Sequence, residues 1–210
     1  MSLNQIEVEF IGEIDKNKFL ELKNLFEREG KFRKTKERLS FMYFRNKIPK
    51  DLSEIKDEPI DLRFRITNKI PEIVLKYGAF TGNHARKEIS INIKNEEIEK
   101  YLELLALLGW YIGVIYAVKT YVYEYKGIEF SLVEIKDYGY NFEAEILTRE
   151  NEADKAKKRI INELNVLGIK SFDEEGLNKQ CNAINNNKKL QFDLLKQSFN
   201  ELKTKFEEFF

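Results

Sequence analysis

Cysteine and histidine are almost absent from this sequence, with one residue of each among 210. A single Cys181 and a single His84 exclude a disulfide framework and a zinc site built from Cys and His ligands. His84 follows Gly82 and Asn83 and has no recognisable partner for nucleophilic catalysis, so we interpret it as an exposed loop residue. The sequence therefore gives no support to chemistry that depends on an imidazole or on paired thiols.

An excess of charge of either sign is missing as well, because Lys plus Arg and Asp plus Glu each number 36. A net charge of zero creates no overall field that would attract nucleic acid or an anionic membrane surface. We therefore expect no nucleic-acid and no membrane partner. A site for an anion would have to come from a local arrangement of cations.

Long uninterrupted hydrophobic runs are also lacking. The most apolar segment, 101–118, contains Glu103, Gly109 and Gly113 and is too interrupted for a membrane-spanning helix. No signal peptide is recognisable at the first residues. With 42% hydrophobic and 34% charged residues, the composition is typical of a folded chain, which we expect to be cytoplasmic and to form one main domain.

Several segments have apolar residues at helical spacing. Asp15 is expected to cap a helix that ends at Gly30, and Asn95 a helix that ends at Gly109. Segment 152–167 predicts an amphipathic helix, and we expect a short helix over 173–182. The end of the chain, 186–210, predicts a further amphipathic helix, because apolar residues recur there at alternating steps of four and three. These residues are Leu195, Phe199, Leu202, Phe206 and Phe209.

Three segments in the middle of the chain, 60–66, 72–77 and 85–93, alternate charged and apolar residues with a period of two. This alternation is typical of strands whose two faces meet different surroundings. In the first segment, Arg63 and Arg65 share one face, and apolar residues share the other. In the other two strands, the charged residues on the corresponding faces are Glu72, Lys76, Arg86 and Glu88. One face of the sheet is thus predicted to concentrate cations.

Pairs of glutamates occur on two further predicted strands. Glu7 and Glu9 share a face of segment 6–11, and Glu143 and Glu145 share a face of segment 141–146. Neighbouring carboxylates repel each other, which is tolerable in water or around a divalent cation. Taken alone, such a pattern is also typical of the solvated face of an edge strand.

The succession of Arg63-x-Arg65, Lys76 and Arg86-x-Glu88 resembles the Leu-Arg-x-Arg, Lys and Arg-x-Glu succession of the CYTH domains. These are the triphosphate tunnel metalloenzymes, which include class IV adenylate cyclases, thiamine triphosphatases and inorganic triphosphatases. The second half of the chain resembles the family through Lys119 and through its segment 142–145, Phe-Glu-Ala-Glu, which is similar to the family's closing Phe-x-Glu-x-Glu strand. Three positions depart from the family pattern, where a lysine, a second cation and an aspartate are expected: Ile11, Tyr121 and Val133.

The resemblance implies a fold of the α+β class, with a closed antiparallel eight-stranded β-barrel that forms the tunnel and helices at its sides. We expect this domain to cover residues 1–185, followed by the helix over 186–210. A closed barrel has no unpaired edges and separates an inner from an outer face.

The resemblance also implies roles for the charged residues. Metal ligands would be Glu7, Glu9, Glu143 and Glu145, which suit Mg²⁺ or Mn²⁺. The triphosphate would be bound by Arg63, Arg65, Lys76, Arg86 and Lys119, of which Lys76, Arg86 and Lys119 would be catalytic, with Glu88 in support. The reaction would be formation of a cyclic nucleotide and pyrophosphate, or hydrolysis of a nucleotide or other organic triphosphate. Recognition of the organic group would come from loops such as 46–59 and 79–85.

Two other hypotheses stay open at this point. Because three family positions are lost, the domain could bind a polyphosphate or nucleotide without turning it over. Alternatively, the chain could be a structural or interaction protein that acts through its tail helix, which could also pair in a homodimer.

Overall fold

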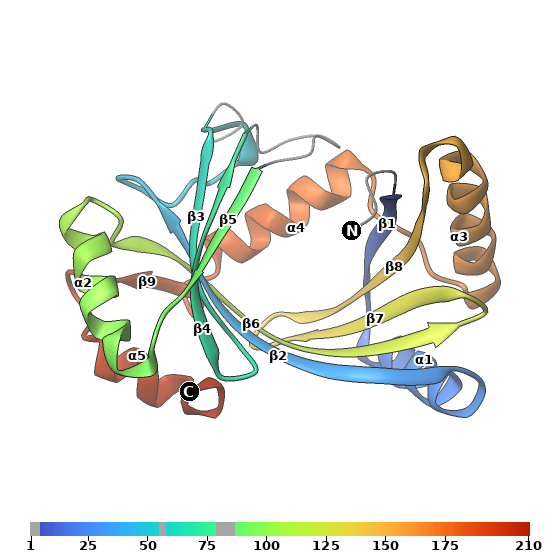
Figure 1. The fold of residues 1–210 in the computed structure, drawn as a ribbon, viewed down its shortest axis with the longest axis horizontal. Helices are drawn as coiled ribbons and strands as arrows, with labels where there is room; N and C mark the ends of the chain where they lie inside the picture. Colours follow the sequence, from blue (N-terminus) through green and yellow to red (C-terminus); the bar gives the residue numbers. More distant parts are fainter. Residues whose placement is uncertain (1–4, 55–57, 79–86) are drawn as a thin grey trace. The chain divides into compact units, whose positions relative to one another are not determined.

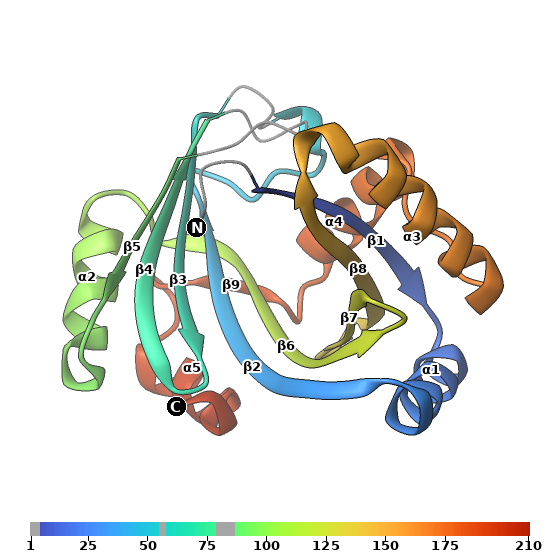
Figure 2. The same ribbon diagram turned by 45° about the vertical axis from the view of Figure 1, so that its right-hand side comes forward.

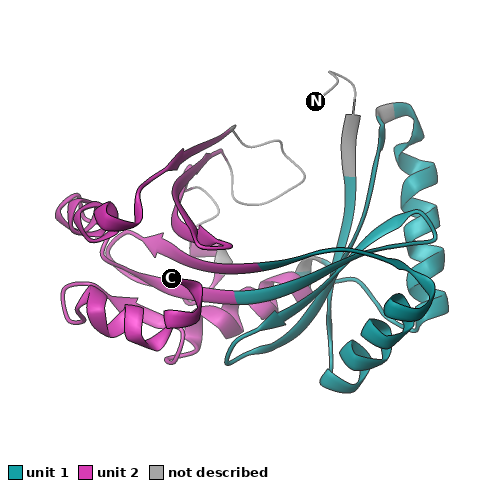
Figure 3. Cartoon of the chain, turned by 60° about the horizontal axis from the view of Figure 1, so that its bottom comes forward, with its two compact units in different colours: residues 1–36, 118–175 teal, residues 37–117, 176–210 magenta. Residues whose placement is uncertain are grey.

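The computed structural model describes residues 5–54, 58–78 and 87–210. The chain divides into two compact units (Figure 3): unit 1 comprises residues 1–36 and 118–175, and unit 2 comprises residues 37–117 and 176–210. The division falls inside strands β2 (Lys31–Phe44) and β6 (Ile112–Tyr125), so both strands contribute to both units.

β-Strands make up the largest share of the regular structure in the described chain (Figure 1). The other strands are β1 (Gln5–Ile14), β3 (Ile60–Thr67), β4 (Ile70–Tyr77), β5 (Lys87–Asn92), β7 (Ile128–Ile135), β8 (Gly139–Arg149) and β9 (Gln191–Asp193). They form a nine-stranded sheet with the order β1-β8-β7-β6-β2-β3-β4-β5, and β9 pairs with β6. The α+β class is confirmed, as are the three central strands.

The predicted closed eight-stranded barrel is not confirmed. β1 and β5 stand at the two ends of the strand order, and no pairing joins them in the part of the chain that the structure describes. Alternation within strands specifies which face of each strand is apolar, but it contains no information about which edges meet. Closure therefore could not be established from the pattern alone.

The helices follow the sequence pattern closely in most places. They are α1 (Lys16–Glu29), α2 (Ile98–Leu107), α3 (Ala153–Leu167), α4 (Glu174–Asn186) and α5 (Phe199–Lys205), with short 3₁₀ turns at Leu52–Glu54 (η1), Asn95–Glu97 (η2), Glu150–Glu152 (η3) and Glu207–Phe209 (η4). The carboxylate of Asp15 caps α1 by accepting a hydrogen bond from the Lys18 amide at 2.8 Å, as predicted. No helix in the described ranges combines the length and the apolar character needed to span a membrane.

Unit 1 buries one face of β1 and β6–β8 beneath α1 and α3 (Figure 1). Phe26 of α1 and Ile160 of α3 are both completely buried against this face, together with Phe130 of β7. Burial of such side chains contributes about 1.5–3 kcal/mol each. The helices are thus held on the sheet by the apolar face that the period-two pattern creates.

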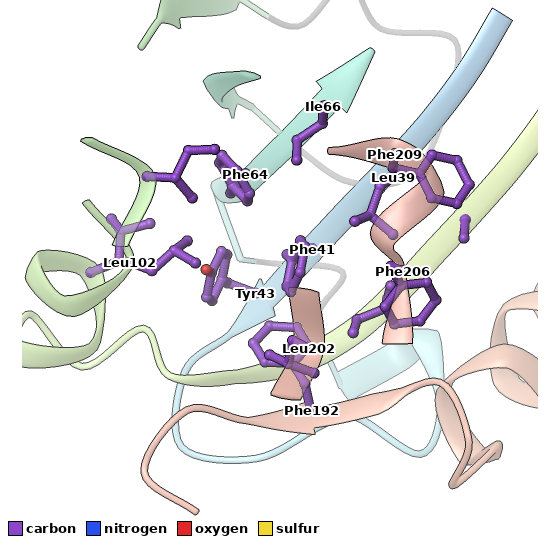
Figure 4. Close-up of a cluster of buried hydrophobic side chains, with 14 of the residues drawn as sticks. Leu39, Phe41, Tyr43, Phe64, Ile66, Leu102, Phe192, Leu202, Phe206 and Phe209 are labelled. Atoms are coloured by element: carbon purple, nitrogen blue, oxygen red, sulfur yellow. The ribbon is translucent and has the colours of Figure 1, made fainter. Parts of the chain in front are cut away.

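Unit 2 buries the apolar face of β2–β4 beneath α2, α5 and β9 (Figure 2). Figure 4 shows the centre of this core, where the tilted rings of Phe41 and Phe64 lie with their centroids 5.5 Å apart and Leu102 of α2 belongs to the same cluster. Phe192 of β9 and Phe206, just after α5, complete the cluster. Because one face of β3 is committed to this core, its charged residues all lie on the opposite face.

The tail differs from the single helix predicted over 186–210. α4 ends at Asn186, β9 pairs with β6, and α5 begins at Phe199, after a capping box formed by Ser198 and Glu201. Leu195, which the heptad-like pattern placed on the apolar seam, is 67% exposed. The other apolar residues of the tail pack into the core of unit 2 from separate elements. The pairing of β9 and the helix cap at Ser198 decide the structure of the tail here, and the periodicity does not.

Candidate functional site

The polar face of β3–β5 in unit 2 gathers the cations that the sequence predicted there. The register pairs Arg65 with Glu72 on β4 and Lys76 with Glu88 on β5. Cross-strand partners in an antiparallel sheet project from the same face. Arg63, two residues from Arg65 on β3, therefore shares this face, which we call the cation face.

Arg63, Arg65 and Lys76 of this face are each paired with a carboxylate. Arg63 donates two hydrogen bonds to Asp61, from Nε to Oδ1 at 2.8 Å and from Nη2 to Oδ2 at 2.7 Å. Arg65 donates from Nε to Glu72 at 2.6 Å and from Nη2 to Glu88 at 3.2 Å. Lys76 Nζ lies 3.1 Å from Glu88 Oε2. Acidic residues thus occupy the donor groups that a phosphate would use.

The ion pairs shift the pKa values of the groups that form them. Burial alone would raise the pKa of Glu72, but the hydrogen bonds from Arg65 and Ser90, with the charges of Arg65 and Arg38, lower it below its usual value. Burial likewise opposes ionisation of Glu88, and the hydrogen bonds and charges of Lys76 and Arg65 more than offset it, so its pKa is also lowered. For Arg65, burial would lower the pKa, but Glu72 and Glu88 raise it. The carboxylates and the guanidinium therefore all stay charged.

Three members of the cation face were not singled out from the sequence. Asp61 precedes the Leu-Arg-x-Arg segment, Ser90 donates to Glu72, and Arg38 of β2 donates from Nε to Thr67 at 3.0 Å. Asp61 lies two residues before Arg63, so the period-two pattern alone would have placed it on this face. Arg38 had no such signal, because only the pairing of β2 with β3 brings it there.

Glutamates predicted as metal ligands are cross-strand neighbours in unit 1. Glu9 on β1 pairs with Glu145 on β8, and Glu145 pairs in turn with Glu129 on β7. Glu143 lies two residues from Glu145 on β8, where the register pairs it with Ile11 and Ser131. The side chain of Glu7 lies outside the described residues. The structure thus places Glu9, Glu143 and Glu145 on one sheet face, which we call the carboxylate face.

Lys119 is not on the carboxylate face. The register pairs it with Glu134, and Glu134 with Tyr140, which puts Lys119 on the face covered by α1. Its Nζ lies 5.8 Å from the ring of Tyr121, which itself meets Phe19 of α1. The structure therefore does not bring Lys119 together with these glutamates. The residue type at position 119 carries no information about the strand face, which depends on the register.

Arg86 lies outside the described residues. Across the described residues, no group of three or more His, Cys, Asp and Glu side chains is arranged to hold a metal ion. The carboxylate oxygens of Glu9 and Glu145 are nevertheless of the chemical type that Mg²⁺ and Mn²⁺ accept, and Mg²⁺ usually completes its coordination with water and substrate phosphates. The donor set therefore fits such an ion through two protein ligands.

Comparison with solved structures identifies the fold. A conserved hypothetical protein from Pyrococcus furiosus is 23% identical, with a TM-score of 0.57 over 81% of this chain and 94% of its own. A candidate adenylate cyclase from Vibrio parahaemolyticus is 14% identical, with a TM-score of 0.53 over 82% and 97%. The chain has the CYTH fold.

A further solved structure of this fold belongs to a protein with a reported activity. A candidate adenylyl cyclase from Hippeastrum, whose structure was reported with a dominant triphosphatase activity, is 15% identical, with a TM-score of 0.53 over 83% of this chain and 96% of its own. No family model and no curated protein sequence matches the chain. At these identities the likeness extends to the CYTH fold, and the reaction has to be argued from residues.

Proposed function

We propose that this protein binds the phosphate chain of an organic triphosphate on the cation face and breaks a phosphoanhydride bond in it. The observation that supports the proposal is that the cations of this face already bind carboxylates of the protein itself. A carboxylate that accepts two parallel hydrogen bonds from one guanidinium mimics two phosphate oxygens, and Arg63 holds Asp61 in this way. Phosphate oxygens could replace these acceptors without any change in the arginine geometry.

The distribution of the cations fits a chain of phosphates better than a single one. Arg63 and Arg65 lie on β3, and Lys76 lies on the neighbouring β4, so three cations line one continuous surface. Three linked phosphates carry about four negative charges, which three or more cations can offset. Catalysis would then consist of positioning and of stabilising the charge that develops on the leaving group, without a covalent intermediate.

A divalent metal ion is a separate part of this proposal. Glu9 and Glu145 of the carboxylate face in unit 1 would supply two carboxylate ligands to Mg²⁺ or Mn²⁺, with Glu143 on the same face, as the resemblance implies. Similarity in fold to candidate cyclases and to a protein with triphosphatase activity supports the general kind of reaction.

Phosphorus NMR of ATP with the purified protein and Mg²⁺ or Mn²⁺ tests the proposal. A metal-dependent product is expected, with pyrophosphate and a cyclic nucleotide marking a cyclase and orthophosphate a phosphatase. Arg65→Ala removes two charge-assisted hydrogen bonds, each worth about 1.5–3 kcal/mol, and should weaken triphosphate binding at least tenfold.

Arg28→Ala is the matched control for the arginine variant. Arg28 is an arginine whose side chain is 67% exposed on α1 in unit 1, so its loss should leave triphosphate affinity unchanged. Circular dichroism checks that Arg65→Ala is still folded. A folded Arg65→Ala protein with the wild-type affinity would contradict the role of the cation face.

Binding without turnover is the second candidate function. It is favoured by the carboxylates that already occupy Arg63, Arg65 and Lys76, and by the location of Lys119 on the opposite side of its strand from the carboxylate face. A ligand must displace internal ion pairs, which reduces affinity, and a catalytic cation is missing from its expected place. Tight binding of ATP with no product after hours of incubation would select this alternative.

A further inference from the structure

Unit 2 contains a pocket of about 210 Å³ where β2 ends and β3 begins. Met42 and the residues that follow it in β2 form one side, Ile60 and Asp61 of β3 form another, and Trp110 closes the pocket. This volume is below the roughly 300–1,000 Å³ of typical small-molecule sites, so the pocket is sized for a part of a ligand.

Asp61 connects this pocket to the cation face. Its carboxylate lines the pocket and also accepts both hydrogen bonds from Arg63. A group in the pocket is thus separated from the Arg63 guanidinium by one side chain. A phosphate on Arg63 and an organic group in the pocket could belong to one molecule.

The charges of the pocket favour the organic end of such a molecule over its phosphates. Glu54, Glu58 and Asp61 contribute three carboxylates to the lining, against two cations, Arg45 and Lys47. Lys47 is already paired with Glu54. Glu58 forms no hydrogen bond or ion pair with any residue that the structure describes, so its carboxylate is available to accept one.

A flat surface forms part of the wall. The guanidinium of Arg45 lies over the indole of Trp110, with Cζ 4.7 Å from the ring centroid. Arginine planes and aromatic rings both stack against flat heteroaromatic groups. Trp110 is 7% exposed and therefore fixed in the core of unit 2, which makes it a rigid part of the wall.

Hydrogen bonds connect the loop that carries the pocket residues to helix α4. The amide of Asn185, which is 5% exposed, donates to the carbonyl of Pro49 at 3.2 Å, and the Asn182 amide donates to Asp51 at 3.0 Å. Asp51 also accepts a hydrogen bond from the Ser53 amide at 2.8 Å. These contacts hold the rim in place before any ligand binds, which lowers the entropic cost of binding.

From this arrangement we infer that the pocket binds the organic group of the triphosphate, and that this group is a flat heteroaromatic ring with an exocyclic amino group, as in adenine. The amino group donates to Glu58, and the ring lies against Arg45 and Trp110. This inference rests on the proposed function, because it takes the phosphates to be bound on the cation face. Such a pocket prefers a nucleoside triphosphate whose base has an amino group. It binds inorganic triphosphate less tightly, and also nucleoside triphosphates whose base has a carbonyl in place of the amino group.

Tryptophan fluorescence tests the inference directly, since Trp110 is the only tryptophan in the chain. ATP should change the emission of Trp110, and inorganic triphosphate should bind without doing so. By calorimetry, ATP should bind about tenfold more tightly than ITP, whose base has a carbonyl in place of the amino group.

Glu58→Ala should weaken ATP binding about tenfold and leave the affinity for inorganic triphosphate unchanged or slightly higher, because a negative charge is removed. Glu96→Ala removes the same charge from an exposed position of η2 and should change neither affinity. Equal affinities of the wild-type protein for ATP, ITP and inorganic triphosphate would overturn the pocket assignment alone, provided that Arg65→Ala weakens all three. If no triphosphate binds, the proposed function and this inference both fail.

Discussion

At the scale of single residues, Glu72 shows how the cation face is stabilised. Its carboxylate accepts hydrogen bonds from Arg65 and Ser90, and its side chain is only 15% exposed. Because these partners lower the pKa of Glu72 in the folded protein, the ionised form is favoured by folding. The associated stability is present above the ordinary pKa of 4.5 and is lost as the pH falls through the lower, folded value.

Glu72→Gln should therefore flatten the acid limb of the stability profile. The free energy of unfolding of the wild-type protein is expected to fall steeply below pH 4.5, and that of the variant less steeply, since one proton-linked group is gone. Urea unfolding between pH 3 and pH 6, followed by circular dichroism, measures both slopes. Two parallel profiles would mean that Glu72 does not contribute to the pH dependence.

At the scale of elements, Gly113 sets how closely three strands approach in unit 2. It lies in β6 and pairs with Phe192 of β9. A Cβ at this position would collide with the carbonyl oxygen of Met42 in β2 and come within 2.8 Å of the Phe192 ring. The backbone oxygen cannot move away independently, so only glycine allows this packing.

Gly113→Ala should consequently destabilise the protein by about 1–3 kcal/mol through overpacking. The expected effect is a lower urea midpoint with an unchanged slope. Gly139→Ala is the control, because a Cβ there would meet no atom within 4 Å. Equal midpoints for both variants would show that β2 and β9 can separate at little cost.

At the scale of the whole molecule, the tail is part of the core of unit 2 and not an appendage. Phe192, Leu202, Phe206 and Phe209 are at most 8% exposed and belong to the same cluster as Phe64. Their burial contributes about 1.5–3 kcal/mol each, a sum comparable with the total stability of about 5–15 kcal/mol of a typical domain. Because the burial of these four side chains is similar in size to the stability of a whole domain, unit 2 depends on roughly the last twenty residues of the chain.

Deleting residues 186–210 should accordingly prevent folding of unit 2 and produce an aggregating chain without a cooperative thermal transition. Leu195→Ser, at a residue of the same tail that is 67% exposed, should leave the melting temperature unchanged. Differential scanning calorimetry compares the two. A shortened chain that melts cooperatively at the wild-type temperature would restore the hypothesis of a separate interaction helix.

The sequence by itself determined the local elements and their faces. Alternation placed Arg63, Arg65 and Lys76 opposite the apolar residues, and Asp15 and Gly30 marked the ends of α1, because strand faces and helix caps depend on neighbouring residues. The ordered family resemblance then predicted the CYTH fold, which the solved structures confirm.

Only the tertiary structure decided features that depend on pairing between distant segments. Register put Lys119 on the helix-covered face and brought Arg38 to the cation face, since a shift of one residue exchanges the faces of a strand. The neutralisation of Arg63 and Arg65 by Asp61, Glu72 and Glu88 likewise required side-chain geometry. The pocket beside Trp110 was invisible for the same reason: it is built from four separate stretches of chain that meet only after folding.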